Sequence, residues 1–176
     1  MKKVLIAAII SVFIIMGTAS APVNAAPYCG ITWGSLPKSA GVMSTGPLTN
    51  IRTGQHDCYD RMVFDFQGAA PGYRVEYVSN VYADGSGQLI PLAGGAKLRI
   101  VALAPSYDST GHTTYPGVTG GMLPGVNLAG YQTFREAKFA GSFEGQTSVG
   151  LGVRARLPFR VFTLDSRLVV DVAHRW

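Results

Sequence analysis

The chain has 176 residues and a formal net charge of +5 at pH 7. This length allows one domain with a hydrophobic core of ordinary size. The excess of 15 basic over 10 acidic residues permits anionic partners, but it is too small to indicate a nucleic-acid-binding protein.

The N-terminus predicts export. Two lysines precede a run from Val4 to Met16 that is apolar except for one serine. This run is typical of a secretory signal core and is too short to span a bilayer. Small residues at 23–25 then fit a cleavage site, and the alternative is an uncleaved anchor. We predict a signal peptide over residues 1–25, and a secreted or extracytoplasmic mature chain with no transmembrane segment.

Cys29 and Cys58 are the only cysteines, and both follow the predicted signal peptide. In an oxidising compartment they most simply form one disulfide, which would stabilise the fold by about 3–4 kcal/mol. Tyr28 does not fit the small residue that precedes an acylated lipoprotein cysteine. A zinc site is the weaker alternative, because two cysteines without a close pair of histidines cannot fill four positions. The disulfide would tie an irregular arm over residues 26–52 to the first strand.

Strand patterns dominate from residue 53 onward. Met62, Phe64 and Phe66 alternate with other residues in period 2, and turn residues follow at Pro71-Gly72. Only residues 128–139 are compatible with a short helix. The pattern predicts an all-β fold over 53–176, an antiparallel two-layer β-sandwich with one long Gly/Pro-rich loop. The expected strands cover residues 61–66, 73–78, 98–103, 146–154, 160–164 and 167–174.

Two of these strands share a pattern. Asp60–Phe66 reads DRMVFDF, and Ser166–Val172 reads SRLVVDV, with Arg, Val and Asp in the same places. We interpret the two strands as equivalent positions in a pseudo-symmetric sandwich. Chance similarity between β sequences is the alternative.

The segment GQHDCYDRMVFDF, from Gly54 to Phe66, raises the question of a metal or catalytic site. His56, Asp57 and Asp60 could supply three metal ligands, or a hydrolase could use His56 with one of the two aspartates. The segment reads as a turn that enters a strand, however, and has no helical His-x-x-x-His pair. We therefore expect a structural cluster, in which the aspartates accept N–H groups of the turn.

The same structural interpretation covers four residues on the two similar strands. Arg61 and Asp65 are expected on the polar face, in position to pair with Arg167 and Asp171 across strands. We predict no metal, no cofactor and no enzymatic activity, since the sequence also lacks a Gly-x-Ser-x-Gly elbow.

Binding residues are expected in two places. Tyr107 and Tyr115 flank His112 in the long loop from 104 to 131, and aromatic rings beside polar groups suit sugars or peptides. The alternative is a loop that is held in place by its own tyrosines. A second candidate is a basic stripe of Arg154, Arg156 and Arg160, which share one parity but are interrupted by Pro158. The alternative for this stripe is a solvated strand face.

Four segments follow one another in order from about Thr53 to His174. They are HDCYDRMVFDFQGAAPGYRVEYV, PLAGGAKLRIVALAPS, FEGQTSVGLGVRARLPFRVF and SRLVVDVAH. The most specific parts are the opening His-Asp-x-x-Asp-Arg-x-Val-Phe and the closing Arg-Leu-Val-Val-Asp-Val. Together the segments resemble the AMIN-like domain of secreted actinobacterial proteins.

The resemblance implies an AMIN-type β-sandwich and a non-catalytic module that binds the cell envelope. The expected ligand is peptidoglycan or another cell-wall glycan, contacted by the 104–131 loop and the basic strand face. One alternative is a protein-interaction module that adjusts a separate envelope enzyme, and another is the secreted hydrolase described above. We expect a monomer.

Overall fold

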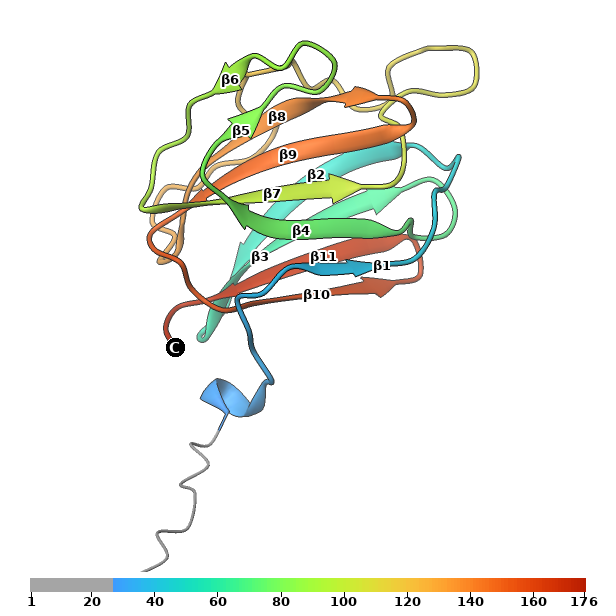
Figure 1. The fold of residues 1–176 in the computed structure, drawn as a ribbon. Helices are drawn as coiled ribbons and strands as arrows, with labels where there is room; N and C mark the ends of the chain where they lie inside the picture. The colour runs from blue at the N-terminus through green and yellow to red at the C-terminus, as the bar shows by residue number, and fades with distance from the viewer. Residues whose placement is uncertain (1–26) are drawn as a thin grey trace, which may run out of the picture.

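The computed structural model describes residues 27–176, which form two layers of β-strands (Figure 1). The described chain contains no α-helix and only one 3₁₀ turn. The elements in chain order are η1 (Tyr28–Gly30), β1 (Lys38–Ala40), β2 (Leu48–Gln55), β3 (Tyr59–Phe66), β4 (Tyr73–Val78), β5 (Val81–Tyr82), β6 (Leu89–Ile90), β7 (Ala96–Ala102), β8 (Phe134–Phe143), β9 (Gln146–Val153), β10 (Phe159–Leu164) and β11 (Arg167–Ala173).

Two antiparallel sheets make the two layers. One has five strands in the order β1-β4-β7-β9-β8, and the other has four in the order β10-β11-β3-β2. The five-stranded sheet lies in front of the four-stranded sheet in Figure 1. The predicted all-β, antiparallel two-layer sandwich is confirmed.

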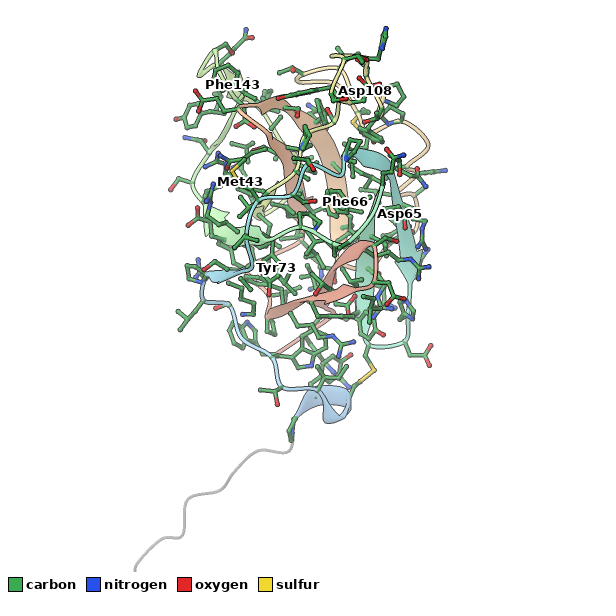
Figure 2. All side chains as sticks on the ribbon, turned by 90° about the vertical axis from the view of Figure 1, so that its right-hand side faces the viewer. Met43, Asp65, Phe66, Tyr73, Asp108 and Phe143 are labelled. Carbon is green, nitrogen blue, oxygen red and sulfur yellow. A yellow bond between two sulfur atoms is a disulfide. The ribbon has the colours of Figure 1, made fainter. Side chains whose placement is uncertain are left out.

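The core lies between the two sheets. Met62, Phe64 and Phe66 of β3 point into it and are buried. Asp65, the residue before Phe66, lies on the outer face, as the side view shows (Figure 2). The facing strands contribute aliphatic side chains at every second position. These include Leu98 and Ile100 of β7 and Val149 and Leu151 of β9.

The short hairpin of β5 and β6 covers the outer face of the five-stranded sheet. Val81, Ile90 and Leu92 form a second apolar cluster there with Ala140. The segment after β6 lies very close to β9. A Cβ atom at Gly152 of β9 would lie only 1.9 Å from the carbonyl oxygen of Ala93, so this position has room only for glycine. The four-stranded sheet has no comparable apolar cluster on its outer face among the described residues.

The short helix that the sequence allowed at 128–139 does not form, because β8 occupies Phe134–Phe143. A β-bulge between Phe134 and Glu136 shifts the register on β9. The extra residue at a bulge interrupts the two-residue alternation of the strand, so Phe134 and Ala137 both face the core although they are three residues apart. In the sequence, core residues with this spacing look like one face of a helix, which explains why the segment seemed compatible with one.

The same effect conceals β2, which lies partly inside the arm that was expected to be irregular over 26–52. Leu48 and Ile51 both face the core, again three residues apart. A register shift between Leu48 and Asn50 accounts for this spacing. The arm is therefore regular at its C-terminal end, and β1 adds three residues to the edge of the five-stranded sheet.

The predicted signal peptide over 1–25 lies outside the described residues. Within the described part of the chain, no helix has the length and apolar character needed to cross a bilayer.

Candidate functional site: the outer face of the four-stranded sheet

The two strands with similar sequences, β3 and β11, are antiparallel neighbours in the four-stranded sheet. Their register places Arg61 opposite Asp171 and Arg167 opposite Asp65. Because similar sequences run in opposite directions, the two Arg–Asp pairs are related by an approximate twofold axis. The predicted cross-strand pairing of these four residues is confirmed, and both pairs lie on the outer face.

The first pair is extended to a triad by a neighbouring strand. Arg61 donates to both carboxylate oxygens of Asp171, from Nε at 2.7 Å and from Nη2 at 2.9 Å. Arg160 of β10 donates from Nε to Oδ2 at 2.7 Å. The carboxylate of Asp171 is fully buried beneath the two guanidinium groups. The hydrogen bonds from Arg61 to Asp171 raise the pKa of Arg61 above its ordinary value. Two arginines and one aspartate give this triad a formal net charge of +1.

The second triad is more open. Arg52 of β2 donates to Asp65 from Nε at 2.8 Å and from Nη2 at 3.0 Å. Nε of Arg167 lies 3.6 Å from Oδ1 of Asp65, which is an ion pair without a hydrogen bond. The side chains of Arg52 and Arg167 are 50% and 48% exposed. Their guanidinium groups are thus more accessible than those of the first triad.

Aromatic rings surround the first triad. The guanidinium carbon of Arg160 lies 5.1 Å from the ring centroids of Tyr59 and Phe162 and 5.4 Å from that of Trp33. Arg61 lies over the rings of Tyr59 and Phe162 as well. Cation–π contacts of this kind hold the arginines in place while part of each ring remains accessible.

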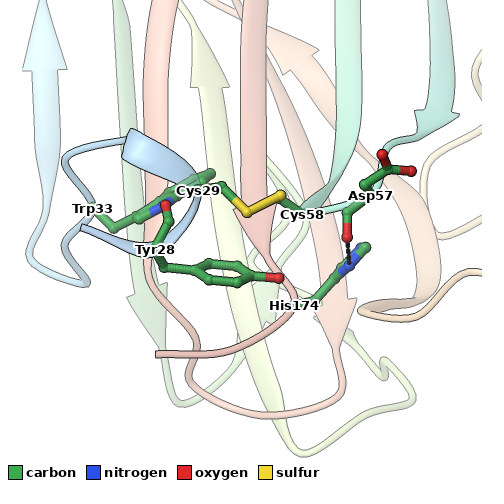
Figure 3. The surroundings of a disulfide bond; sticks show 6 residues. All are labelled: Tyr28, Cys29, Trp33, Asp57, Cys58 and His174. Atoms are coloured by element: carbon green, nitrogen blue, oxygen red, sulfur yellow. Dashed lines mark hydrogen bonds between the residues drawn. A yellow bond between two sulfur atoms is a disulfide. The ribbon is translucent and has the colours of Figure 1, made fainter. Parts of the chain in front are cut away.

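The disulfide fixes the arm that supplies Trp33. Cys29 and Cys58 are bonded, which confirms the predicted pairing (Figure 3). The indole Nε1 of Trp33 donates to the carbonyl oxygen of Tyr28 at 2.8 Å. The covalent bond therefore holds one end of the arm beside β3, so that Trp33 can reach Arg160 on β10.

His56, Asp57 and Asp60 do not converge on one site. The exposed ring of His56 stacks on Tyr59 at 4.6 Å. Asp57 uses its backbone carbonyl, which accepts a hydrogen bond from Nδ1 of His174 at 3.2 Å (Figure 3). Asp60 points inward and is fully buried. No group of three or more His, Cys, Asp or Glu in the described chain is arranged to hold a metal ion.

The three residues proposed for binding in the long loop are dispersed. Tyr115 is 2% exposed and packs against Phe139 in the core, so its ring is not available at the surface, and this part of the expectation is corrected. The hydroxyl of Tyr107 accepts a hydrogen bond from the backbone of Gly145 at 3.2 Å. Only His112 is exposed, in a tight turn.

That tight turn is organised by Asp108. Its Oδ1 accepts hydrogen bonds from the hydroxyl and the backbone N–H of Thr110, at 2.6 and 2.8 Å. These bonds, chiefly the one from the hydroxyl, lower the pKa of Asp108. His112 contributes its own N–H to the same oxygen. This turn is thus held by its own polar groups, and not by the tyrosines that the alternative named.

The expected stripe of three arginines is divided. β9 ends at Val153 and β10 begins at Phe159, so Arg154 and Arg156 lie in the connection, and only Arg160 lies on a strand. Arg154 donates to backbone carbonyls of Gln132 and His174, and Arg156 donates to that of Ser35. Both exposed side chains thus use their donors on backbone carbonyls of neighbouring segments.

Sequence reasoning missed four members of the outer face as binding residues. Arg52, Tyr59 and Phe162 lie on paired strands with their side chains on the same face as Arg61 and Asp171, but the pairing of β2 and β10 with these strands is not visible in sequence. Trp33 lies in the arm before β1, where no strand parity could identify it. The four residues are Trp33, Arg52, Tyr59 and Phe162.

Comparisons with curated proteins and with solved structures found no match. A family model described as AMIN-like domain matches residues 46–174. The match includes all of β2–β11 and therefore both triads. The chain belongs to the AMIN-like domain family.

Proposed function

We propose that this protein is a secreted, non-catalytic module that binds a cell-wall glycan such as peptidoglycan through the outer face of its four-stranded sheet. AMIN-like domains are generally binding modules rather than catalysts. The observation that carries the proposal is the pair of Arg–Asp–Arg triads, one of them enclosed by the rings of Trp33, Tyr59 and Phe162.

The chemistry of this face suits a glycan with anionic substituents. Aromatic rings pack against the apolar faces of sugars, and arginine N–H groups donate to hydroxyl and carboxylate oxygens. Four arginines share two aspartates, which leaves a net charge of +2 for the two triads. Salt-sensitive attraction to an anionic polymer is the expected result.

The location follows from the family and the disulfide. The AMIN-like domain and the bonded Cys29 and Cys58 indicate an extracytoplasmic protein, because disulfides persist in oxidising compartments. We infer that the signal peptide predicted over residues 1–25 directs export and that the mature chain remains at the envelope.

Sedimentation with isolated cell walls tests the proposal. The disulfide-bonded protein should pellet with the walls at low salt, and Phe162→Ala with Arg160→Gln should weaken binding by about tenfold or more. Arg61 still pairs with Asp171 in this variant, so the carboxylate keeps a partner. Arg74→Gln, an exposed arginine on the other sheet, is the matched control. Wild-type protein that stays in the supernatant would reject the proposal.

A protein-interaction module is the second candidate, and a specific groove favours it. A cavity of about 770 Å³ lies between the segment after β1 and the edge strand β10. Exposed Val42 and Met43 line it beside Val161 and Thr163 of β10. An apolar strand of a partner could pair with this edge. Crosslinking in whole cells distinguishes the candidates, since one defined protein partner supports this reading and a wall polymer supports the first.

A further inference from the structure

We propose that the cavity beside the open triad binds the terminal carboxylate of a short peptide with small aliphatic side chains. This inference rests on the proposed function, since peptidoglycan joins a glycan to short peptides that carry carboxylates, and it names the part of the polymer that this site recognises. The cavity measures about 260 Å³ and lies on the outer face of the four-stranded sheet. Its lining is Arg52, Thr53, Gly54, His56, Arg61, Val63, Leu164, Arg167 and Val169.

The charges around the cavity favour an anion. Three arginines and one histidine line it, and no carboxylate is among the described lining residues. Arg52 and Arg61 are already hydrogen bonded to Asp65 and Asp171. Arg167 makes no side-chain hydrogen bond among the described residues, and its closest approach to Asp65 is 3.6 Å. Its N–H donors are therefore free to bind a ligand.

A carboxylate suits this donor, because its single charge matches one free guanidinium better than the nearly double charge of a phosphate monoester does. A guanidinium group presents two parallel N–H donors that fit the two oxygens of a carboxylate. Of the three arginines that line the cavity, Arg167 alone has its full set of donors uncommitted, whereas Arg52 uses Nε and Nη2 on Asp65. One carboxylate group of a ligand, which is planar and singly charged, thus fits the free guanidinium of Arg167.

The residues at the floor of the cavity favour a small aliphatic side chain next to the carboxylate of the ligand. Val63 and Val169 face each other across β3 and β11 at the centre of the twofold relationship, and Leu164 adds an exposed apolar side chain. Val63 and Val169 are already only 6% and 1% exposed, so a small alkyl group would mainly cover the side chain of Leu164, which is 47% exposed. Because clefts for drug-sized ligands measure about 300–1,000 Å³, this cavity accommodates the end of a chain and not a whole polymer repeat.

Gly54 keeps the cavity open. It lies on β2 opposite Arg61, so any side chain at this position would point to the outer face. A Cβ built there would meet only Nε2 of His56, at 3.9 Å. The backbone of Gly54 is not in the left-handed region, so a larger residue can be introduced without strain. Substitution at this position fills the cavity and leaves the core unchanged.

The test uses protein purified from an exporting bacterial host with its disulfide intact, and acetyl-Ala-Ala as the probe. Binding is followed by amide chemical shifts in NMR spectra, with the C-terminal amide of the same peptide and glycerol 3-phosphate as comparison ligands. The variants are Gly54→Ile, which fills the cavity, and Arg167→Gln, which removes the free guanidinium. Arg74→Gln on the other sheet is the control, and thermal melting confirms that each variant is folded.

The proposal predicts that the free acid shifts amides of β2, β3 and β11, and that amidation weakens binding about tenfold or more. Both cavity variants should lose binding to a similar extent, and the control should retain it. Equal binding of acid and amide, unchanged binding in both variants, or a preference for glycerol phosphate would overturn the proposal. If the wild-type protein pellets with cell walls but does not bind acetyl-Ala-Ala, this proposal is also overturned, while the proposed function stays supported.

Discussion

Asp60 and His174 form a buried pair that joins three separate parts of the sandwich. Oδ1 of Asp60 lies 3.1 Å from Nε2 of His174, just after β11. Oδ2 of Asp60 accepts the backbone N–H groups of Thr133 and Phe134 at 2.6 and 3.0 Å. One carboxylate on β3 thus fixes the start of β8 in the opposite sheet and the end of the chain.

Asp60→Ala should lower the free energy of unfolding by about 3–5 kcal/mol. The substitution leaves two buried N–H groups and the imidazole of His174 without their partner, and such losses are large in a buried site. Urea denaturation of the purified protein measures the change. Asp57→Ala is the matched control, because Asp57 contributes only its backbone carbonyl, and a change within about 0.5 kcal/mol is expected. Equal effects of the two substitutions would contradict the structural role of Asp60.

The partly buried Tyr77 and the buried Tyr115 should respond differently to removal of the hydroxyl. The hydroxyl of Tyr77 donates to the carbonyl oxygen of Leu157 at 2.6 Å and accepts its N–H at 3.0 Å. The buried hydroxyl of Tyr115 has no hydrogen-bond partner among the described residues. Tyr77→Phe should therefore cost about 1–2 kcal/mol, whereas Tyr115→Phe should be neutral or slightly stabilising. Chemical denaturation of both variants gives the comparison, and a larger loss for Tyr115→Phe would refute it.

The same two tyrosines predict a loss of stability at alkaline pH. Burial raises the pKa of Tyr77 and that of Tyr115 from 10.0 to about 12. Because the folded state holds these protons more tightly than the unfolded state, their contribution is complete below about pH 10 and declines as the pH rises to about 12. The free energy of unfolding should fall over this range. The double variant with Phe at both positions should show a shallower decline, and an unchanged slope would argue against this assignment.

Removal of the disulfide should loosen the N-terminal arm and spare the sandwich. Cys29 and Cys58 are separated by 29 residues, so their bond contributes about 3–4 kcal/mol on the chain-entropy model. The double Cys→Ser variant should lose about this much and keep its β-sheet circular dichroism. The fluorescence of Trp33 should shift to the red, because the indole would leave Tyr59 and Arg160. An unchanged emission maximum would mean that other contacts hold the arm.

Strands whose side chains alternate without interruption, such as β3 and β11, could be predicted from the amino-acid pattern alone. Alternation in Met62, Phe64 and Phe66 is a local property, because successive side chains of a strand point to opposite faces. The disulfide could also be predicted, since the chain offers only two cysteines for one bond. Strands with a β-bulge were missed or mistaken, as the spacing of Leu48 and Ile51 and of Phe134 and Ala137 shows.

The location of the candidate site depends on how the strands are ordered in the sheet, which is not a local property of the sequence. The sequence indicated that Arg61 and Asp171 belong together, but the partners Arg52 and Arg160 come from strands on either side whose order depends on the sheet topology. The residues chosen from the long loop were dispersed for the same reason. An aromatic residue in a loop has no strand parity to show whether it faces solvent or the core, and Tyr115 is buried because the loop folds back onto β8.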